Sequence, residues 1–391
     1  MSKQELHVVN PYTEQVAFSL PLLAAGEVDG VVQRARKAFL GWRGSPMADR
    51  VALCIRFVAA FKGMADRVAA DVSTQMGKPR AHALGEVGRL VERAEYMTAI
   101  AEETLADEAV PALPGFTRYI RHEPLGVVFD MAAWNYPLLI AVNVVVPALL
   151  AGNAVIIKHS SRTPRCGQAF VEAFAKAGAP PDLVQNVVAD HAVTEAFVRH
   201  PGVDYVSFTG STRGGHDVSR AAADRFIDVG LELGGKDPAY VCADAPFEFA
   251  VENCVDGVLF NAGQSCCAIE RIYVDRAIYD DFIEAYAAKA REYAVPGDPM
   301  ADGTTLGPMA SPGAPAFLAE QVDAAVRAGG RLIVSRDDFD VPAQGWFAPP
   351  AVVADAPQDS ALMQEESFGP VVGIRPVDNA DEAVRLMNDS R

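Results

Sequence analysis

The stretch that determines the fold class is residues 126–158, GVVFDMAAWNYPLLIAVNVVVPALLAGNAVIIK. It opens with a short apolar run, turns into a helical pattern from about Pro137 to Leu150, and closes on a second apolar run at 154–158. Gly152-Asn153 is a typical helix stop before a buried strand. The stretch therefore predicts a strand, a helix and a second strand.

The same apolar run, from 137 to 157, is about long enough to span a bilayer. Asn143, Pro147 and the Gly152-Asn153 stop interrupt it. We therefore expect no membrane span, and the interrupted run fits the helix and buried strand instead.

Further along the chain, short apolar strands are predicted at 183–188 and 205–208, each followed by a helical pattern. Such alternation is typical of a parallel, doubly wound α/β sheet. A second α/β unit is expected to begin near Glu232. Its predicted elements are strands at 239–241, 269–274 and 331–334, and helices at 247–260, 277–293, 316–328 and 380–388.

Composition narrows the class of protein. The formal net charge of −17 argues against a general nucleic-acid or anionic-membrane surface. The six cysteines are scattered without metal-ligand spacing, which favours a thiol-keeping, cytoplasmic protein and no metal site. The first residues contain no apolar core, so we expect no signal peptide.

Three turns after predicted strands carry residues suited to bind a ligand, because strand ends face the crevice of an open α/β sheet. A fourth candidate lies just before Gly234 and Gly235, which let the backbone approach a ligand. These residues are Asn135, Lys158, the Gly210-Ser211 pair and Glu232. Each has an ordinary alternative: a turn asparagine, a solvated lysine, a helix N-cap and a surface glutamate. Apolar neighbours could bury Glu232 in part, which would raise its pKa towards that of a general base. The dinucleotide pattern GxGxxG is absent.

The loop FNAGQSCC at 260–267 lies between a predicted helix and a predicted strand. Gly263 permits a sharp turn there. Cys266 is either a nucleophile held at that turn or a small apolar filler, which is the usual role of a free cysteine.

Taken together, these stretches resemble the aldehyde dehydrogenase superfamily in motif order and spacing over essentially the whole chain. The motifs are Trp134–Pro137, Phe208–Thr212, Leu231–Lys236, Gly263–Cys266 and Glu366–Pro370. The resemblance implies a Rossmann-like cofactor domain, an α/β catalytic domain and a small oligomerisation segment. The expected boundaries are 1–112 and 124–231 for the cofactor domain, 113–123 for the oligomerisation segment and 232–391 for the catalytic domain.

The resemblance also implies roles for single residues. Cys266 would be the nucleophile, Glu232 the general base and Asn135 the oxyanion-hole amide. NAD or NADP would be bound by Trp134, Lys158, Ser161, Gly210, Ser211, Glu366 and Phe368. The substrate tunnel would be lined by Tyr136, Ile140, Asn143 and Phe260. The implied reaction oxidises an aldehyde to a carboxylic acid, in a homodimer or homotetramer.

Three departures from the family pattern bear on this expectation. Ser161 stands where many members have an acidic residue, so NADP can be accepted. Ala133 replaces a common proline, a change we expect to be tolerated. Family members usually run longer, so we expect the catalytic domain to be C-terminally incomplete and the chain to be poorly stable. Two alternatives remain open: a CoA-acylating semialdehyde dehydrogenase, and an inactive truncated homologue with a binding or structural role.

Overall fold

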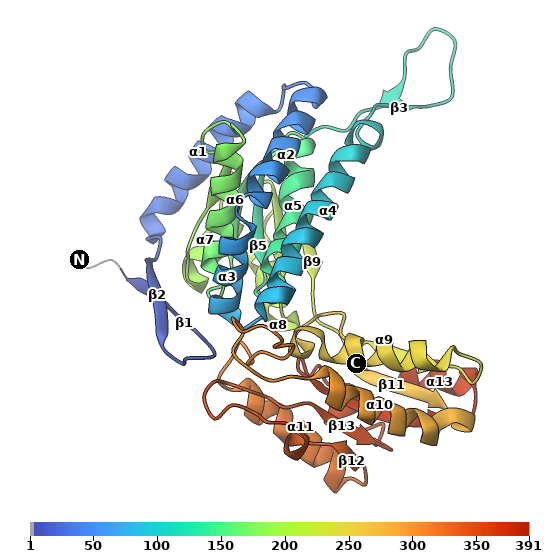
Figure 1. The fold of residues 1–391 in the computed structure, drawn as a ribbon. Helices are drawn as coiled ribbons and strands as arrows, with labels where there is room; N and C mark the ends of the chain where they lie inside the picture. The colour runs from blue at the N-terminus through green and yellow to red at the C-terminus, as the bar shows by residue number, and fades with distance from the viewer. Residues whose placement is uncertain (1–3, 391) are drawn as a thin grey trace. The chain divides into compact units, whose positions relative to one another are not determined.

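The computed structural model describes residues 4–390, which form two compact units (Figure 1). The first unit contains residues 4–8, 18–71 and 84–233, and the second contains 9–17, 72–83 and 234–390. The main division thus falls next to the predicted boundary at Glu232. Two short stretches from the N-terminal part of the chain belong to the second unit. The functions expected of the predicted domains remain predictions.

The elements up to residue 232 are mainly those of the first unit. They are β1 (Glu5–Val9), β2 (Val16–Pro21), η1 (Ala25–Glu27), α1 (Val28–Trp42), α2 (Met47–Lys62), α3 (Ala65–Met76), α4 (Arg80–Thr104), β3 (Glu108–Ala109), β4 (Tyr119–Ile120), β5 (Val127–Ala132), α5 (Pro137–Leu150), β6 (Ala154–His159), α6 (Pro164–Lys176), β7 (Val184–Asn186), α7 (His191–Arg199), β8 (Tyr205–Thr209), α8 (Thr212–Ala222) and β9 (Asp228–Glu232).

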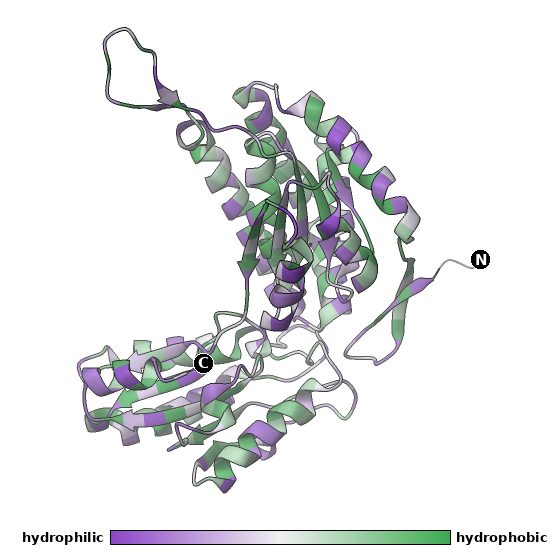
Figure 2. Ribbon diagram, turned by 180° about the vertical axis from the view of Figure 1, so that it is seen from behind, coloured by the Kyte–Doolittle hydropathy of each residue, from purple (hydrophilic) through white to green (hydrophobic). Residues whose placement is uncertain are grey.

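The main sheet of the first unit is parallel throughout, in the order β7-β6-β5-β8-β9. Every residue of β5 is buried, as expected for a central strand covered on both faces. On one face Phe129 stacks on Phe197 of α7 at 4.9 Å between ring centroids. His159, whose side chain points to the other face, lies 6.3 Å from Phe170 of α6. The strands form the hydrophobic centre of the unit, and polar residues gather on the helices (Figure 2).

The elements of the second unit continue the α/β pattern. They are β10 (Pro238–Val241), α9 (Phe247–Leu259), η2 (Phe260–Gly263), β11 (Arg271–Asp275), η3 (Arg276–Ile278), α10 (Tyr279–Tyr293), α11 (Ala314–Arg327), β12 (Arg331–Val334), η4 (Arg336–Asp338), β13 (Ala351–Ala354), α12 (Ala361–Gln364), β14 (Val371–Val377) and α13 (Ala380–Met387).

The sheet of the second unit has the order β10-β11-β14-β13-β12, and only β12 pairs antiparallel among its strands. Strand β11, which lies between β10 and β14 in this sheet, shows how the unit is layered. Ile272 and Val274 enter one core cluster together with residues of α9 and α10. Tyr273, between them, enters a second cluster with residues of α11, α12 and α13. Alternate side chains therefore face opposite helical layers.

The predicted helix from Pro137 to Leu150 and the strand that follows it are confirmed. No helix among residues 4–390 is both long and apolar enough to cross a membrane. The alternating residues at 116–123 predict an exposed strand, and this prediction is wrong in extent. Tyr119–Ile120 pairs with Glu108–Ala109, on a hairpin that extends from the first unit (Figure 1), and Phe116 forms an isolated bridge with Leu113. This short ladder has exposed residues throughout, so no core packing extends it.

The strands that were not predicted include β9, β13 and β14. Gly230 interrupts the pattern of β9, and Gly373 and Pro376 interrupt that of β14. Glycine and proline lower the local preference for a strand. Tertiary pairing on both sides of β14 overrides that preference.

Candidate active site

The predicted residues of the first unit follow parallel strands at one edge of the sheet. Asn135 follows β5, Lys158 ends β6, Gly210 and Ser211 follow β8, and Glu232 ends β9. The register pairs Met131 with Lys158 and Thr209 with Glu232. All of these positions therefore lie at the carboxyl edge of the sheet, where ligands bind in open α/β folds.

The turn that carries Asn135 leads directly into α5. Tyr136 is the N-cap of α5 and makes no side-chain capping hydrogen bond. The carboxylate of Glu86, which lies on α4, caps α5 instead. It accepts hydrogen bonds from the first backbone amides of α5. Asn135 itself is only 3% exposed. A tertiary contact thus holds the turn beside Asn135.

The Gly210-Ser211 turn forms the start of α8. Ser211 is the N-cap and accepts a hydrogen bond from the Gly214 amide at 3.2 Å. A Cβ atom at Gly210 or at Gly214 would lie 2.6 Å from the Phe208 ring, so a larger residue at either position would displace that ring. Ser211 and Thr212 are exposed, which leaves the positive end of the helix open to solvent. Such a helix start is suited to a phosphate group.

Lys158 and Ser161 lie at the end of β6 and in the turn after it. Burial lowers the pKa of Lys158, and Asp190 opposes that shift. Ser161 is exposed, and the guanidinium of the next residue, Arg162, lies 5.7 Å from the centre of the Trp134 ring. A lysine ammonium and an exposed serine hydroxyl can both bind ribose or phosphate oxygens.

The expected partial burial of Glu232 is wrong, because its side chain is exposed at the end of edge strand β9. Its backbone carbonyl accepts a hydrogen bond from the Gly210 amide at 3.0 Å, which ties the two turns together. An edge strand has a neighbour on one side only, so apolar neighbours in sequence do not enclose the carboxylate.

In the second unit, Cys266 follows an unusual turn. Asn261, Ala262 and Gly263 all have positive φ angles, of 55°, 55° and 67°. Residues other than glycine rarely adopt this left-handed region, and strain of this kind is concentrated at functional sites. A Cβ atom at Gly263 would lie 2.2 Å from the carbonyl oxygen of Gly369. The turn ends with Cys266 exposed.

Gln264 holds this turn from inside the second unit. Its side-chain oxygen accepts a hydrogen bond from the Ala310 amide at 2.9 Å, and its side-chain nitrogen donates to the Asn261 carbonyl at 3.3 Å. Desolvation raises the pKa of the Cys266 thiol above its ordinary value of 9.0, and Cys267 raises it further. Ser265 contacts the sulfur of Cys267 at 3.3 Å, so Cys266 and Cys267 have different neighbours.

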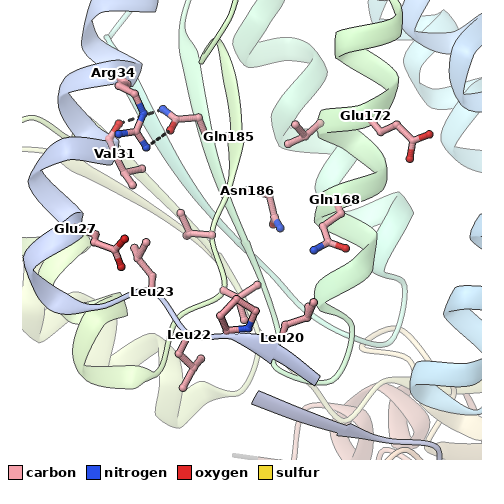
Figure 3. Close-up of a pocket in the computed structure, with 14 residues that line it drawn as sticks. Leu20, Leu22, Leu23, Glu27, Val31, Arg34, Gln168, Glu172, Gln185 and Asn186 are labelled. Atoms are coloured by element: carbon pink, nitrogen blue, oxygen red, sulfur yellow. Dashed lines mark hydrogen bonds between the residues drawn. The ribbon is translucent and has the colours of Figure 1, made fainter. Parts of the chain in front are cut away.

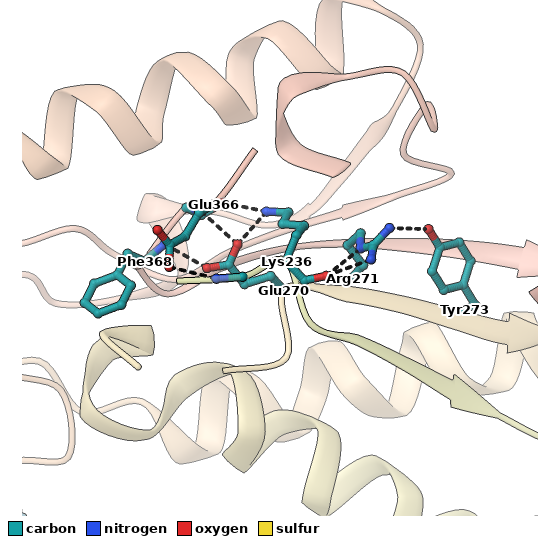
Figure 4. A network of polar contacts seen from close by, with 8 residues as sticks. Lys236, Glu270, Arg271, Tyr273, Glu366 and Phe368 are labelled. Carbon is teal, nitrogen blue, oxygen red and sulfur yellow. Dashed lines mark hydrogen bonds and ion pairs between the residues drawn. The ribbon is translucent and has the colours of Figure 1, made fainter. Parts of the chain in front are cut away.

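Glu366 and Phe368 lie on a loop held by a buried ion pair (Figure 4). Lys236 and Glu270 are 2.7 Å apart, and both contact the loop. Burial raises the pKa of Glu366, Glu270 raises it further, and a hydrogen bond from the Gly235 amide opposes the shift.

The predicted tunnel residues of α5 share one side of the helix. Tyr136, Ile140 and Asn143 follow helical spacing, and all three are less buried than the fully enclosed Leu138 and Ala141. In the second unit, Phe260 stacks on His82 at 4.4 Å between ring centroids. Burial lowers the pKa of His82, and nearby Lys78 lowers it further.

A cavity of 620 Å³ lies elsewhere in the first unit, between α1, α6 and β7 (Figure 3). Its polar walls include Arg34 and Gln185, and none of its lining residues is a predicted site residue. This cavity is thus not the predicted site.

Sequence reasoning missed the residues that hold the site residues in place. Glu86, Gln264, Lys236 and Glu270 each act through tertiary hydrogen bonds or ion pairs. Lys236 and Gln264 lie inside two of the family motifs, and this position could have indicated that they support the site. Nothing in the local sequence around Glu86 singles it out.

The chain is similar to known proteins over its whole length. A sequence model described as "Aldehyde dehydrogenase family" matches residues 1–391. Succinate-semialdehyde dehydrogenase (NADP(+)) 1 of Mycobacterium tuberculosis is 35% identical over 382 residues, which are 97% of this chain and 83% of that protein. Geranial dehydrogenase of Castellaniella defragrans is 35% identical and is matched over 100% of this chain and 81% of its own length.

Solved structures show the same fold. Betaine aldehyde dehydrogenase from Staphylococcus aureus, in complex with NAD+, superposes with a TM-score of 0.91 at 28% identity, covering 99% of this chain and 77% of that one. An NADP-dependent enzyme of E. coli superposes with a TM-score of 0.94 at 28% identity, and the match covers 99% of this chain and 80% of that one.

The chain belongs to the aldehyde dehydrogenase family. It is an aldehyde dehydrogenase that oxidises an aldehyde to a carboxylic acid with NAD or NADP. The expected α/β architecture of this family is confirmed.

Proposed function

We propose that Cys266, Glu232 and Asn135 carry the aldehyde oxidation, with Cys266 as the attacking nucleophile. The observation that carries this assignment is the turn before Cys266. Three consecutive left-handed residues lie three positions before an exposed thiol, and the turn is anchored by the buried side chain of Gln264. Backbone strain that is fixed by surrounding structure supports a functional role for the residue it presents.

The proposed reaction proceeds through a covalent bond between Cys266 and the substrate. The Cys266 thiolate adds to the aldehyde carbon and forms a C–S bond, and the carbonyl oxygen becomes an oxyanion. The Asn135 amide donates a hydrogen bond to that oxyanion. Loss of hydride from the carbon then leaves a thioester. Glu232 removes a proton from water, which attacks the thioester, and cleavage of the C–S bond releases the carboxylic acid and the thiolate.

The residues present fit a nicotinamide dinucleotide. The open start of α8 at Ser211, with no Cβ at Gly210 or Gly214, supports binding of the pyrophosphate. Lys158 and Ser161 would bind the adenosine ribose. Trp134, which would also bind the cofactor, has the guanidinium of Arg162 over its ring. Glu366 and Phe368 would hold the nicotinamide half. The bound cofactor supplies the hydride acceptor.

Ser161 carries the choice between the two cofactors. It is exposed and uncharged where many family members have a carboxylate. A carboxylate there would repel a 2′-phosphate, whereas a serine hydroxyl can donate a hydrogen bond to it. We propose that this enzyme accepts NADP as well as NAD.

Water is the proposed acyl acceptor. Glu232 is exposed at the end of β9 and is therefore free to bind and deprotonate a water molecule. A CoA-acylating dehydrogenase would need no such base, because the thiol of CoA attacks the thioester directly.

The β3–β4 hairpin is the proposed oligomerisation segment. It exposes large apolar side chains, including Phe116 at 68% and Ile120 at 51%. Exposed apolar side chains on a two-stranded hairpin favour burial against another subunit. We propose a homo-oligomer built through this segment, and a cytoplasmic location supported by six free cysteines.

The test compares the parent chain with three variants, using a panel of aldehydes with NAD and with NADP. We expect Cys266→Ala to abolish reduction of the cofactor. Glu232→Gln should keep a single-turnover burst and lose steady turnover, because deacylation needs the base. Cys267→Ala, the matched control, should keep most of the activity.

Three results would overturn parts of the proposed function. Full activity of Cys266→Ala would exclude Cys266 as the nucleophile. Acyl-CoA formation that exceeds acid formation when CoA is added would favour the CoA-acylating alternative. A parent chain that binds the cofactor but turns over none of the aldehydes would favour the inactive homologue.

A further inference from the structure

One buried ion pair in the second unit holds the loop that carries Glu366 and Phe368. The ammonium of Lys236 and the carboxylate of Glu270 are 2.7 Å apart, and their side chains are 4% and 3% exposed. Lys236 lies just before β10 and Glu270 just before β11, and these neighbouring strands pair Pro238 with Arg271. The sheet register thus brings the two charges together.

Both members of the pair bind the same loop (Figure 4). Glu270 accepts hydrogen bonds from the backbone amides of Ser367 at 2.8 Å and Phe368 at 2.9 Å, one on each carboxylate oxygen. Lys236 donates to the Ser367 hydroxyl at 2.9 Å. The adjacent Gly235 amide donates to Glu366 at 3.3 Å. The loop is therefore held at three consecutive residues.

This loop needs such support, because Phe368 has a φ angle of 53°. That conformation is unfavourable for a bulky residue and persists only where neighbouring groups impose it. The two amides that Glu270 binds belong to this strained residue and to the residue just before it. The carboxylate is therefore the group that fixes the backbone, and Lys236 neutralises its buried charge.

Glu270 also lies in the segment that carries the proposed nucleophile, four positions after Cys266. The segment between them is short, and the backbone amide of Ala268 is hydrogen-bonded to the Ser265 carbonyl. Through Glu270, the segment with the proposed nucleophile is joined directly to the loop that would hold the nicotinamide half.

We propose that Lys236 and Glu270 are positioning residues that set the Glu366–Phe368 loop for hydride transfer. This inference rests on the proposed function of that loop. As positioning residues, they would act through this loop and not on the aldehyde itself. The alternative is a purely structural ion pair, whose loss would lower the folded fraction without changing the rate of each folded molecule.

The experiment uses the charge-neutral double variant Lys236→Met/Glu270→Leu, because removing both charges avoids an uncompensated buried ion. Three quantities are measured: the melting temperature, the single-turnover rate of NADPH formation per folded molecule, and the deuterium isotope effect on kcat with a deuterated aldehyde. Lys289→Met is the matched control, since Lys289 makes only surface ion pairs in the same unit.

We expect the double variant to form NADPH at least about tenfold more slowly, with a larger isotope effect, because small misplacements of reacting groups have large kinetic costs. The KM for the aldehyde should change little. Lys289→Met should match the parent. A folded double variant with the parent's single-turnover rate would overturn the proposal.

Two milder variants decide the matter if the double variant does not fold. Glu270→Asp keeps the negative charge, but its shorter side chain moves the carboxylate away from the loop. Ser367→Ala removes only the contact with Lys236. Both should remain folded and slow hydride transfer by about threefold or more. If both variants keep the single-turnover rate of the parent, the proposal is wrong. A parent enzyme that forms neither NADH nor NADPH would instead contradict the proposed function.

Discussion

The carboxylate of Glu86 accepts a hydrogen bond from the backbone amide of Leu138 at 2.8 Å and so caps α5 from a neighbouring helix. The same oxygen accepts the Leu139 amide at 3.2 Å. Both Glu86 and Leu138 are buried. An anionic cap at a helix start also interacts favourably with the helix dipole. The contact holds the turn that presents Asn135.

Glu86→Ala should lower the free energy of unfolding by about 1–3 kcal/mol, because buried amides lose a charged acceptor. It should also lower kcat/KM, because the turn beside Asn135 is released. Glu86→Gln keeps an amide oxygen at this place and should retain more of both. Urea unfolding and steady-state kinetics measure the two effects.

Glu95→Ala is the control on the same helix, since Glu95 makes an exposed ion pair with Lys62. Its stability should stay within about 0.5 kcal/mol of the parent. Equal stability of Glu86→Ala and Glu95→Ala would contradict the capping role.

Gly263→Ala should disrupt the nucleophile turn. Gly263 has a φ angle of 67°, and an added Cβ would lie 2.2 Å from the Gly369 carbonyl oxygen. We expect a loss of stability of about 3 kcal/mol or more, since strain and a backbone clash act together. Thermal unfolding measures it.

Gly303→Ala separates these two causes. Gly303 also has a positive φ, of 83°, but has open space around it. It should cost only about 1–2 kcal/mol, from backbone strain alone. If both variants lose the same stability, contact with Gly369 is not the dominant cause.

Cys267→Ser should increase the reactivity of Cys266 in the free enzyme. Desolvation and the adjacent Cys267 thiol both raise the pKa of Cys266. Removal of that thiol leaves desolvation as the main cause and lowers the pKa, so more thiolate is present at pH 8. Alkylation by iodoacetamide should become faster.

The measurement is made in a Cys242→Ser background, because Cys242 is also exposed, whereas Cys54, Cys166 and Cys254 are buried. Mass spectrometry assigns the modified residue. An unchanged or slower alkylation of Cys266 would rule out the influence of Cys267.

His159→Leu should remove part of the stability loss in acid. Burial lowers the pKa of His159 from an ordinary value of 6.5 to about 3. Below pH 6.5 the unfolded chain binds a proton that the folded chain does not bind. This residue therefore reduces stability by about 1.4 kcal/mol for each pH unit between these two values. Urea unfolding from pH 7 to pH 4 should show a flatter profile in the variant.

Asp130 supplies a comparison with the opposite sign. Burial raises its pKa well above the ordinary 3.8, so its contribution to stability is present below that value and is lost as the pH rises. Asp130→Asn should therefore gain stability relative to the parent as the pH rises from 4 to 7. A parallel pH profile of His159→Leu and the parent would show that His159 does not titrate as described.

Ser161→Glu should change the cofactor preference. A carboxylate at this exposed position would repel the 2′-phosphate of NADP and could accept hydrogen bonds from the ribose hydroxyls of NAD. We expect kcat/KM with NADP to fall by about tenfold or more relative to NAD. Ser161→Gln has a side chain of the same size without the charge and should shift the ratio much less. Equal ratios in the two variants would remove the electrostatic explanation.

Much of the fold was predictable because it depends on short-range patterns. The strand-helix-strand stretch at 126–158 contains its own apolar runs, its own turn and its own helix stop. Gly263 predicted a sharp turn before Cys266, but nothing in the sequence predicted the positive φ angles of Asn261 and Ala262. The unpredicted strands β9, β13 and β14 depend on neighbours that are distant in sequence.

The sequence by itself determined the family, the identity of the candidate residues and the order of the strands that present them. Local apolar patterns and motif spacing suffice for this, since they are properties of adjacent residues. Only the tertiary structure decided how those residues are held: the Glu86 cap on α5, the Gln264 anchor and the Lys236–Glu270 pair beneath Phe368. It also decided that Glu232 is exposed. The physical reason is that burial and ion pairing depend on residues that folding brings together from distant parts of the chain.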